Sequence, residues 1–313
     1  MRVVALAGGT GGAKLAHGFQ LVLPAGDLAV VVNSGDDTER HGLLVMPDHD
    51  AVLYMLGGRF DDERGWGIAG ESWTVMDELE RYGEAGWFRL GDRDFATHIA
   101  RGARLREGAT LTDAVLALQA ARGLPSAILP MSDAPVRTQV RTDEGWLDFQ
   151  EYFVHRRQAP EVREVRFAGI DAARPTPRVE DAFAGARVVV IGPSNPIVSI
   201  GPILAVSGMR ELVDGVRSRG VPVVAVSGIV GGRALKGPAD RMLVSLGLES
   251  SAQTVAEQYA PWLDGFVLDE VDRSLEPSIR ALGLRTLVTD TIMADHAGRA
   301  RLARTVLEFA TSP

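Results

Sequence analysis

The fold is decided by residues 2–14, Arg2-Val-Val-Ala-Leu-Ala-Gly-Gly-Thr-Gly-Gly-Ala-Lys14, in which an apolar run passes directly into four glycines. A short, continuous, β-branched run of this kind predicts a strand that is buried on both faces. The residues from Gly12 to Leu23 then have the apolar spacing of an amphipathic helix. Because a doubly wound α/β sheet begins with a strand, a glycine turn and a helix, we expect that architecture here.

The same alternation of apolar runs and amphipathic stretches continues in the second half of the chain. Further buried strands are predicted at Leu28–Asn33, Arg187–Ile191, Val221–Ser227, Gly265–Leu268 and Leu284–Val288. Further helices are predicted at Gly208–Arg219, Ala239–Leu246 and Asp295–Ala310. This order predicts an α/β fold with a doubly wound, mostly parallel, Rossmann-like sheet.

The middle of the chain departs from this alternation. Residues 61–121 have a helical composition, and residues 137–154 alternate about Gly145 in the manner of a β-hairpin. A proline-containing stretch, Ala172–Arg178, is the expected connection back to the main sheet. We therefore predict a single α/β domain over residues 1–313, with a helical and hairpin insertion at residues 60–155.

Composition excludes several classes of function. The formal net charge of -8 is opposite in sign to the basic surface that tracks nucleic acid. The absence of cysteine excludes disulfides, thiolate metal sites and a cysteine nucleophile. No apolar run approaches the roughly 20 residues that cross a bilayer, and the first one is too short for a signal peptide. We expect a cytoplasmic protein with neither nucleic acid nor membrane as a partner.

The glycine segment Gly8–Lys14 has the chemistry of a phosphate-binding loop. Glycines let the backbone approach a phosphate, and the following helix presents free N–H groups and the positive end of its dipole. The segment matches neither the dinucleotide fingerprint, because Lys14 stands at the third glycine position, nor the P-loop, because Ala13 and Leu15 replace its later residues. A tight turn without a ligand remains the alternative.

Two acidic pairs follow the second predicted strand, Asp36-Asp37 and, about a dozen residues later, Asp48 and Asp50. In a doubly wound sheet the loops after the first two strands lie side by side, so these carboxylates should converge beside the glycine loop. Magnesium takes one or two carboxylates together with phosphate oxygens. We predict Asp37 and Asp50 as its ligands, with Asp50 in a polar loop. The other Asp of each pair, Asp36 and Asp48, is interpreted as a loop or capping residue.

Two later loops extend this edge of the predicted sheet. Residues 192–202 contain three prolines, together with Ser194, Asn195 and Ser199, and residues 227–240 add Arg233 and Lys236 before a helix. Loops of this chemistry after four strands favour a large, nucleotide-like ligand. The insertion adds a segment from Trp87 to His98 in which aromatic and charged residues alternate. It is equally typical of a site that stacks a planar heterocycle and of a plain hydrophobic core.

The chain resembles the 2-phospho-L-lactate transferase family of coenzyme F-420 biosynthesis over nearly its whole length. The resemblance lies in ordered motifs: Gly8–Gly12, Val32–Asp37, Pro47–Tyr54, Leu90–Asp94, Ala96–His98, Leu129–Asp133, Gly192–Pro196 and Leu235–Asp240. One departure is Gly228, where members of the family have proline.

The resemblance implies a reaction in which a guanosine diphosphate ester gives its phospho-acid, with lactate or enolpyruvate, to the ribityl hydroxyl of a 5-deazaflavin and releases GMP. It implies a Mg²⁺ cofactor and a deazaflavin contact at Asp50 and Arg89. With the aromatic segment, the predicted deazaflavin residues are Asp50, Arg89, Trp87 and His98, and the predicted catalytic residues are Asp50 and Asp37. The predicted nucleotide-binding residues are Gly9, Thr10, Gly11, Gly12, Lys14, Ser194, Asn195, Pro196, Lys236 and Gly237.

Two other functions remain open from the sequence. The chain is also similar to gluconeogenesis-factor proteins of the same fold superfamily, which bind uridine-diphosphate sugars without turning them over. A non-catalytic, nucleotide-sugar-binding regulator is therefore one alternative. A nicotinamide oxidoreductase is disfavoured by Lys14 at the third glycine position. The sequence leaves open which three-carbon acid is transferred and whether the protein is a homodimer, as is habitual in the family.

Overall fold

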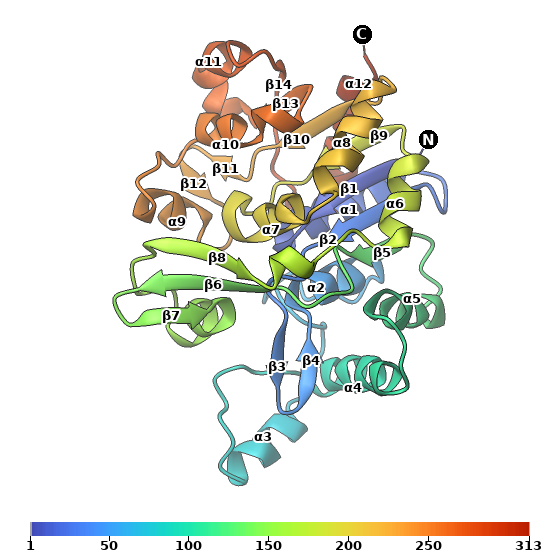
Figure 1. Ribbon diagram of the computed structural model, residues 1–313, viewed down its shortest axis with the longest axis vertical. Coiled ribbons are helices and arrows are strands. Elements are labelled where there is room, and N and C mark those ends of the chain that lie inside the picture. Colours follow the sequence, from blue (N-terminus) through green and yellow to red (C-terminus); the bar gives the residue numbers. More distant parts are fainter. Residues whose placement is uncertain (1, 313) are drawn as a thin grey trace.

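A computed structural model describes residues 2–312. Its centre is a parallel sheet with seven strands within the described chain, in the spatial order β14-β13-β10-β9-β1-β2-β5 (Figure 1). In that order the strands are Arg285–Thr289, Gly265–Asp269, Val223–Val226, Val188–Ile191, Val3–Ala7, Leu28–Val32 and Ala127–Pro130. The predicted α/β class, the parallel sheet and six of the strands are confirmed.

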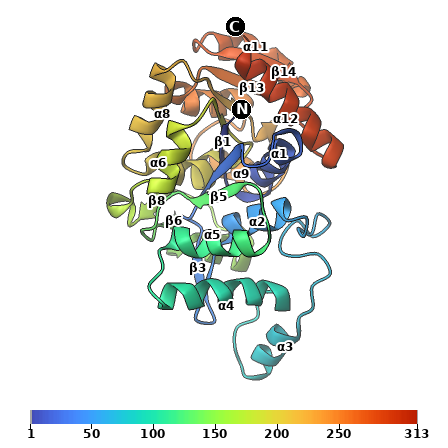
Figure 2. The same cartoon turned by 90° about the vertical axis from the view of Figure 1, so that its right-hand side faces the viewer.

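Helices cover both faces of this sheet, as Figure 2 shows for α6 and α8 on one side and α1 and α12 on the other. Successive residues of β1 belong to different cores, because Val4 and Leu6 pack into one hydrophobic cluster and Val3 and Ala5 into the other. One layer contains α1 (Gly9–Val22), α2 (Pro47–Leu56) and α12 (His296–Thr311). The other contains α6 (Pro177–Ala184), α8 (Met209–Ser218), α10 (Ala252–Tyr259) and the short α7 (Gly201–Ala205), α9 (Ala239–Ser245) and α11 (Glu276–Arg280).

The middle of the chain is more varied than predicted. The stretch 60–155 contains α3 (Thr74–Arg81), α4 (Asp92–Arg106) and α5 (Leu111–Ala121), but it also contains β5, which belongs to the central sheet. Residues 60–155 are therefore not one continuous insertion. Below the sheet in Figure 1, α3 and α4 lie beside a small hairpin that the sequence did not predict, formed by β3 (Thr38–Arg40) and β4 (Leu43–Val45).

The predicted hairpin exists, with a shorter second strand. Strands β6 (Arg137–Thr142) and β7 (Gly145–Asp148) pair antiparallel, and the rest of the expected strand forms a π-helical turn, Glu151–His155. A third strand, β8 (Glu164–Ala168), pairs with the other edge of β6. The last small sheet joins β11 (Ile229–Val230) to β12 (Arg233–Ala234).

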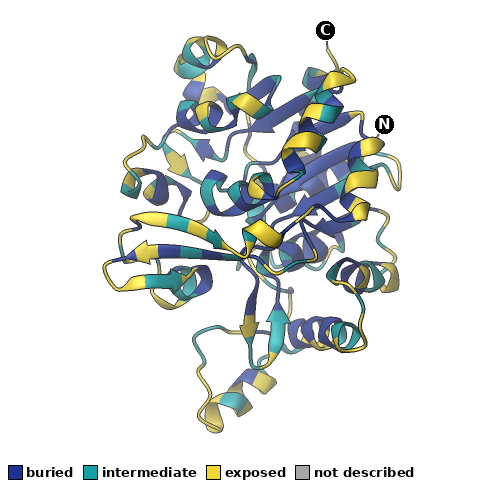
Figure 3. Cartoon of the chain, in the orientation of Figure 1, coloured by how far each residue is buried: buried dark blue, intermediate teal, exposed yellow. Residues whose placement is uncertain are grey.

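The central sheet is buried and the peripheral elements are more exposed. The central strands are enclosed, while α3 and β8 carry many exposed residues (Figure 3). Within residues 2–312 no single helix is long and apolar enough to cross a membrane. One bent pair, Pro196–Ala205 with Met209–Ser218, passes that test by length and composition alone.

Candidate active site

The glycine loop after β1 is the first turn of helix α1, which begins at Gly9 rather than at Gly12 as predicted. Its N–H groups are partly used within the protein. The Gly8 N–H donates to Ser194 Oγ at 3.1 Å, and the Gly9 N–H donates to Asp48 Oδ1 at 2.6 Å. These contacts bring the predicted residues Gly9 and Ser194 together and tie the loops after β1 and β9 to the start of α2.

The glycines of this loop are required by packing. A Cβ atom at Gly11 would lie 2.1 Å from the Pro193 carbonyl oxygen, and one at Gly12 would lie 2.5 Å from Ser194 Oγ. Larger residues would therefore push the loop after β9 away from α1. In that loop Asn195 Oδ1 accepts from the N–H groups of Ile197 and Val198, so its carbonyl caps the turn that begins at Pro196.

Two lysines lie over the glycine loop. Lys14 Nζ donates to the Met293 carbonyl at 3.3 Å, and the Lys236 side chain, beside Gly237, reaches back to Gly65. Burial, followed by the charges of Arg299 and Lys236, lowers the pKa of Lys14. Neither lysine forms an ion pair within residues 2–312, so both charges are available to an anion. The Thr10 hydroxyl donates to Gly65 O, so Thr10 and Lys236 meet at the same residue.

Three buried carboxylates, Asp36, Asp37 and Asp48, gather beside this loop. Burial, reinforced for Asp36 by the neighbouring Asp48, raises the pKa of Asp36 and of Asp37 well above the ordinary value. Burial raises the pKa of Asp48 to about 6 against the opposing hydrogen bonds from Asn33 and Gly9. Among the described residues, one oxygen of Asp36 and one of Asp37 have no hydrogen-bond partner. Several buried carboxylates with free lone pairs form a donor set that fits a hard divalent cation.

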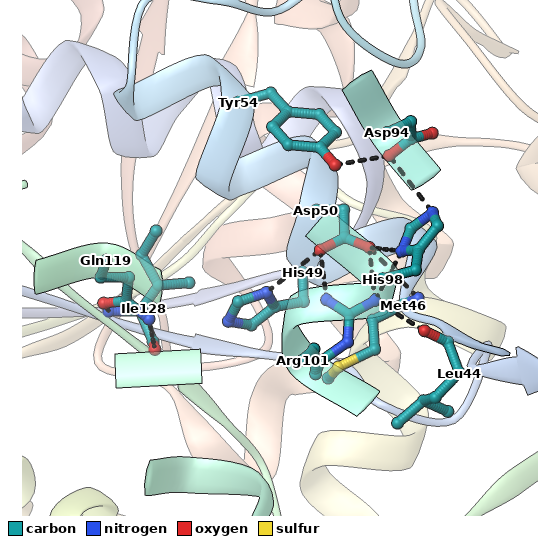
Figure 4. Close-up of polar contacts among 10 residues, drawn as sticks. All are labelled: Leu44, Met46, His49, Asp50, Tyr54, Asp94, His98, Arg101, Gln119 and Ile128. Carbon is teal, nitrogen blue, oxygen red and sulfur yellow. Dashed lines mark hydrogen bonds and ion pairs between the residues drawn. The ribbon is translucent and has the colours of Figure 1, made fainter. Parts of the chain in front are cut away.

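Asp50 differs from these three, and its predicted place in a polar loop is wrong. It lies in the first turn of α2 with 4% of its surface exposed. Arg101 Nη1 and Nη2 donate to its two carboxylate oxygens at 2.7 and 3.0 Å (Figure 4). Burial would raise the pKa of Asp50, but the Arg101 guanidinium, with His49 and His98, outweighs burial and holds that pKa below its usual range. Asp50 is thus a fixed, ionised acceptor. Among the described residues, Asp50, Asp94 and His98 also offer metal-ligand atoms that lie within 4.8 Å of one another.

His98 belongs to the same buried network. Arg101 Nη2 lies 2.8 Å from His98 Nδ1, and because a guanidinium can act here solely as a donor, Nδ1 accepts. The proton of the neutral ring is then on Nε2, which lies 3.3 Å from Asp94 Oδ1. The Tyr54 hydroxyl donates to that same Asp94 oxygen. His98 therefore contacts Arg101 through Nδ1 and lies beside Asp94.

Sequence analysis identified His98 but missed Arg101, Asp94 and Tyr54. Their spacing carried a signal, because Asp94, His98 and Arg101 share one face of α4 at i, i+4 and i+7. Asp50 and Tyr54 share a face of α2 in the same way. Polar residues at helical spacing within buried segments indicate a network that must be satisfied internally.

All four predicted deazaflavin residues line one cavity of about 410 Å³. Asp50 and His98 lie at its polar end, while Trp87 and Arg89 belong to its outer wall. The Trp87 ring stacks on His155 with centroids 4.8 Å apart, and the Arg40 guanidinium lies 4.3 Å from its centroid. The remaining lining is largely aromatic and apolar, with Tyr54, Trp66, Phe88, Phe153 and Val154 among it. A planar heterocycle with one polar end fits this arrangement.

Comparison with known proteins identifies the family. The chain matches the family described as "2-phospho-L-lactate transferase CofD" over residues 3–302. The chain belongs to this family. It is 43% identical to a phosphoenolpyruvate transferase of Streptomyces griseus, covering 99% of this chain and 98% of that protein. It is 40% identical to a 2-phospho-L-lactate transferase of Methanosarcina mazei, covering 98% and 99% respectively.

The family fold is also seen in a more distant protein. A crystal structure of a UPF0052 family protein from Bacillus halodurans superimposes with a TM-score of 0.65 at 14% identity, over 98% of this chain and 99% of that one. This likeness supports the architecture and nothing about activity.

Gly228, the departure from the family pattern, lies against the loop after β9, because a Cβ there would be 2.9 Å from Ser194 O.

Proposed function

We propose that this protein transfers a phospho-acid from a guanosine diphosphate ester to the ribityl hydroxyl of a 5-deazaflavin in coenzyme F-420 biosynthesis. The acceptor oxygen forms a bond to the phosphorus that carries the acid and loses its proton to solvent, the bond from that phosphorus to the bridging oxygen breaks with its electron pair on that oxygen, and GMP leaves. The observation that carries the proposal is the aromatic cavity, whose polar end at Asp50 adjoins the carboxylates of the glycine-loop edge. Membership of a family of named transferases supports the same chemistry.

The acceptor side of the site supplies orientation. The aromatic wall of the cavity encloses a flat ring system, and the ionised Asp50 accepts a hydrogen bond from the ribityl hydroxyl that is to react. A carboxylate whose pKa is held low is a weak base, so the main contribution of Asp50 is to aim the hydroxyl oxygen at phosphorus. Phosphoryl transfer depends more on such positioning than on a strong base.

The donor side supplies charge compensation. Lys14 and Lys236 lie where they can contact the diphosphate, and the first turn of α1 presents N–H groups toward it. Asp37, together with Asp36 or Asp48, would hold Mg²⁺, which when bound neutralises phosphate charge on the leaving GMP. The loop Ser194-Asn195-Pro196 would form the nucleoside side of the groove.

The alternative function is that of a regulator that binds a nucleotide sugar without turnover, because gluconeogenesis-factor proteins resemble this chain in fold. Two observations favour the transferase: the buried carboxylates with free oxygens and the aromatic cavity beside them. A protein that merely binds a nucleotide sugar needs neither a metal-binding centre nor a second, heterocycle-sized cavity.

Nucleotide selectivity is expected to separate the two functions. GMP and GDP should bind in the micromolar range and raise the melting temperature, because a ligand that binds the folded state stabilises it by mass action. Differential scanning fluorimetry across GMP, GDP and UDP measures this effect. Equal stabilisation by UDP would favour the regulator and contradict the proposed donor.

Arg89 is expected to contribute to acceptor binding. It lines the cavity, is 43% exposed at its side chain, and donates to Asp77 at 3.0 Å. Arg89→Ala should raise the KM for the deazaflavin by about tenfold, the usual effect of losing one charged hydrogen bond, and Arg89→Lys should restore part of the loss because it lacks bidentate geometry. Fluorescence titration and steady-state kinetics measure both.

Arg81 provides the matched control for this experiment. It is an exposed arginine on α3 that pairs with Glu78 and does not line the cavity. Arg81→Ala should leave the KM unchanged. A wild-type KM in Arg89→Ala would mean that the acceptor does not contact this wall.

A further inference from the structure

A second cavity, of about 360 Å³, opens at the carboxyl ends of β2 and β5. Ser34 and Asp37 from the loop after β2 form one wall, and Asp133 and Arg137 from the segment after β5 form the other. Leu44 of β4 also lines it, and the Leu44 carbonyl accepts from Arg101. Arg101 and β4 therefore separate the two cavities.

Two buried polar atoms at this cavity lack partners. Ser34 is 3% exposed and Asp37 is 4% exposed, and neither Ser34 Oγ nor Asp37 Oδ1 has a hydrogen-bond partner in the described part of the chain. Because a buried hydroxyl or carboxylate left unpaired costs free energy, such atoms indicate a missing ligand. Both line the cavity. The Asp37 oxygen is assigned to the proposed cation, so Ser34 Oγ is the atom whose ligand is expected inside the cavity.

The charges at the cavity favour an anion at Arg137. One oxygen of Asp133 is engaged, since Thr112 N and Oγ1 at the amino end of α5 both donate to its Oδ1 at 2.7 Å. Asp37 faces the proposed cation. The Arg137 guanidinium donates to the Val136 carbonyl and forms no ion pair within residues 2–312. It is the positive charge at this cavity that no side chain of the described chain neutralises by direct contact.

The strand order relates this cavity to the donor. The loop Ser194-Asn195-Pro196, proposed for the nucleoside, follows β9, and the glycine loop follows β1. The carboxylates follow β2, and the second cavity lies after β2 and β5. These features therefore succeed one another along a single sheet edge. The span from β9 to β5 is three strand spacings, roughly 14 Å at about 4.8 Å each. A guanosine diphosphate ester laid along this edge with its nucleoside at β9 extends its acid end toward β5.

We propose that the second cavity is the subsite for the small carboxylic acid of the donor, with the carboxylate of that acid bound by Arg137 and Ser34. This inference rests on the proposed function, because it takes the donor and its direction from there. A donor bound in this way has the phosphorus that carries the acid beside Asp36, Asp37 and Asp48. That phosphorus then lies between the acid subsite and the acceptor hydroxyl, which enters from the aromatic cavity.

The test compares ligands with and without the acid. GDP and the lactyl and enolpyruvyl esters of guanosine diphosphate are titrated into wild-type protein, Arg137→Met and Ser34→Ala by calorimetry, with magnesium and without acceptor. The wild type should bind at least one ester more tightly than GDP. Arg137→Met should weaken ester binding about tenfold or more and leave GDP binding unchanged, since a charged hydrogen bond is lost in the acid subsite. Ser34→Ala should act in the same direction with a smaller effect.

Arg141 on the same strand, β6, is the matched control, because it is exposed and pairs with Glu164. Arg141→Met should bind all three ligands as the wild type does. Unchanged ester affinity in Arg137→Met, with GDP binding intact, would overturn the subsite and leave the proposed function standing. Failure of the wild type to bind GDP or either ester would overturn both.

Discussion

Replacing Asp37 with asparagine is expected to lower turnover by at least two decades without unfolding the protein. Asp37 is buried, and one of its oxygens has no hydrogen-bond partner in the described structure. The isosteric amide keeps the shape of the side chain but cannot supply a charged ligand to a cation. Because burial already disfavours the charge of Asp37, its removal should not reduce the melting temperature of the metal-free protein.

Metal removal should reproduce the effect of this substitution. EDTA is expected to abolish turnover and magnesium to restore it. Magnesium should also raise the melting temperature of the wild type more than that of Asp37→Asn, a measurement that does not depend on activity. Asp143→Asn serves as the control, because Asp143 is an exposed hairpin residue paired with Arg163. Full activity in excess EDTA, or an equal magnesium response in Asp37→Asn, would contradict the metal site.

The central sheet could be predicted because its strands are continuous apolar runs, and such runs require burial on both faces. Strand β5 escaped prediction because Ala127–Pro130 has four residues and ends in proline, which resembles a loop. Strand β3, Thr38–Arg40, is short and polar, and pairing with β4 forms it where its own residues do not favour a strand. The alternation of exposed and half-buried residues in β8 was a usable signal for a strand.

The site was predictable to the extent that it depends on strand ends. The loops after β1, β2 and β9 meet because parallel strands end at one edge, and for that reason Gly9, Asp37 and Ser194 could be identified. The partner of Asp50 could not be identified in this way. Arg101 is 51 residues away and reaches Asp50 through the packing of α4 against β4, which no local pattern determines. Missing Arg101 led to the wrong loop environment for Asp50.

The buried pair of Asp50 and Arg101 changes what substitutions at Asp50 should do. Removing one partner of a buried ion pair leaves the other uncompensated, which costs about 3–5 kcal/mol. Asp50→Ala is therefore expected to destabilise the fold as well as the reaction, and Asp50→Asn is the better test because the amide still accepts from Arg101. In Asp50→Asn the maximal rate should fall by two or more decades while nucleotide affinity in magnesium changes little. A parallel loss of nucleotide affinity would instead make Asp50 a metal ligand.

Arg101→Met supplies the second half of this prediction. Without the guanidinium the largest influence that opposes burial is gone and His49 and His98 alone still lower the pKa of Asp50, so that pKa should rise. The rate of Arg101→Met should then increase as the pH rises through that raised pKa. In the wild type Asp50 is already ionised across the same range and contributes no such increase. Arg217→Met is the control, since Arg217 pairs with Asp264 at the opposite edge of the sheet and its loss should reduce stability without altering the pH profile. A flat profile in Arg101→Met, with stability recovered by an added stabilising ligand, would show that Arg101 maintains the fold and does not maintain the charge that orients the acceptor hydroxyl.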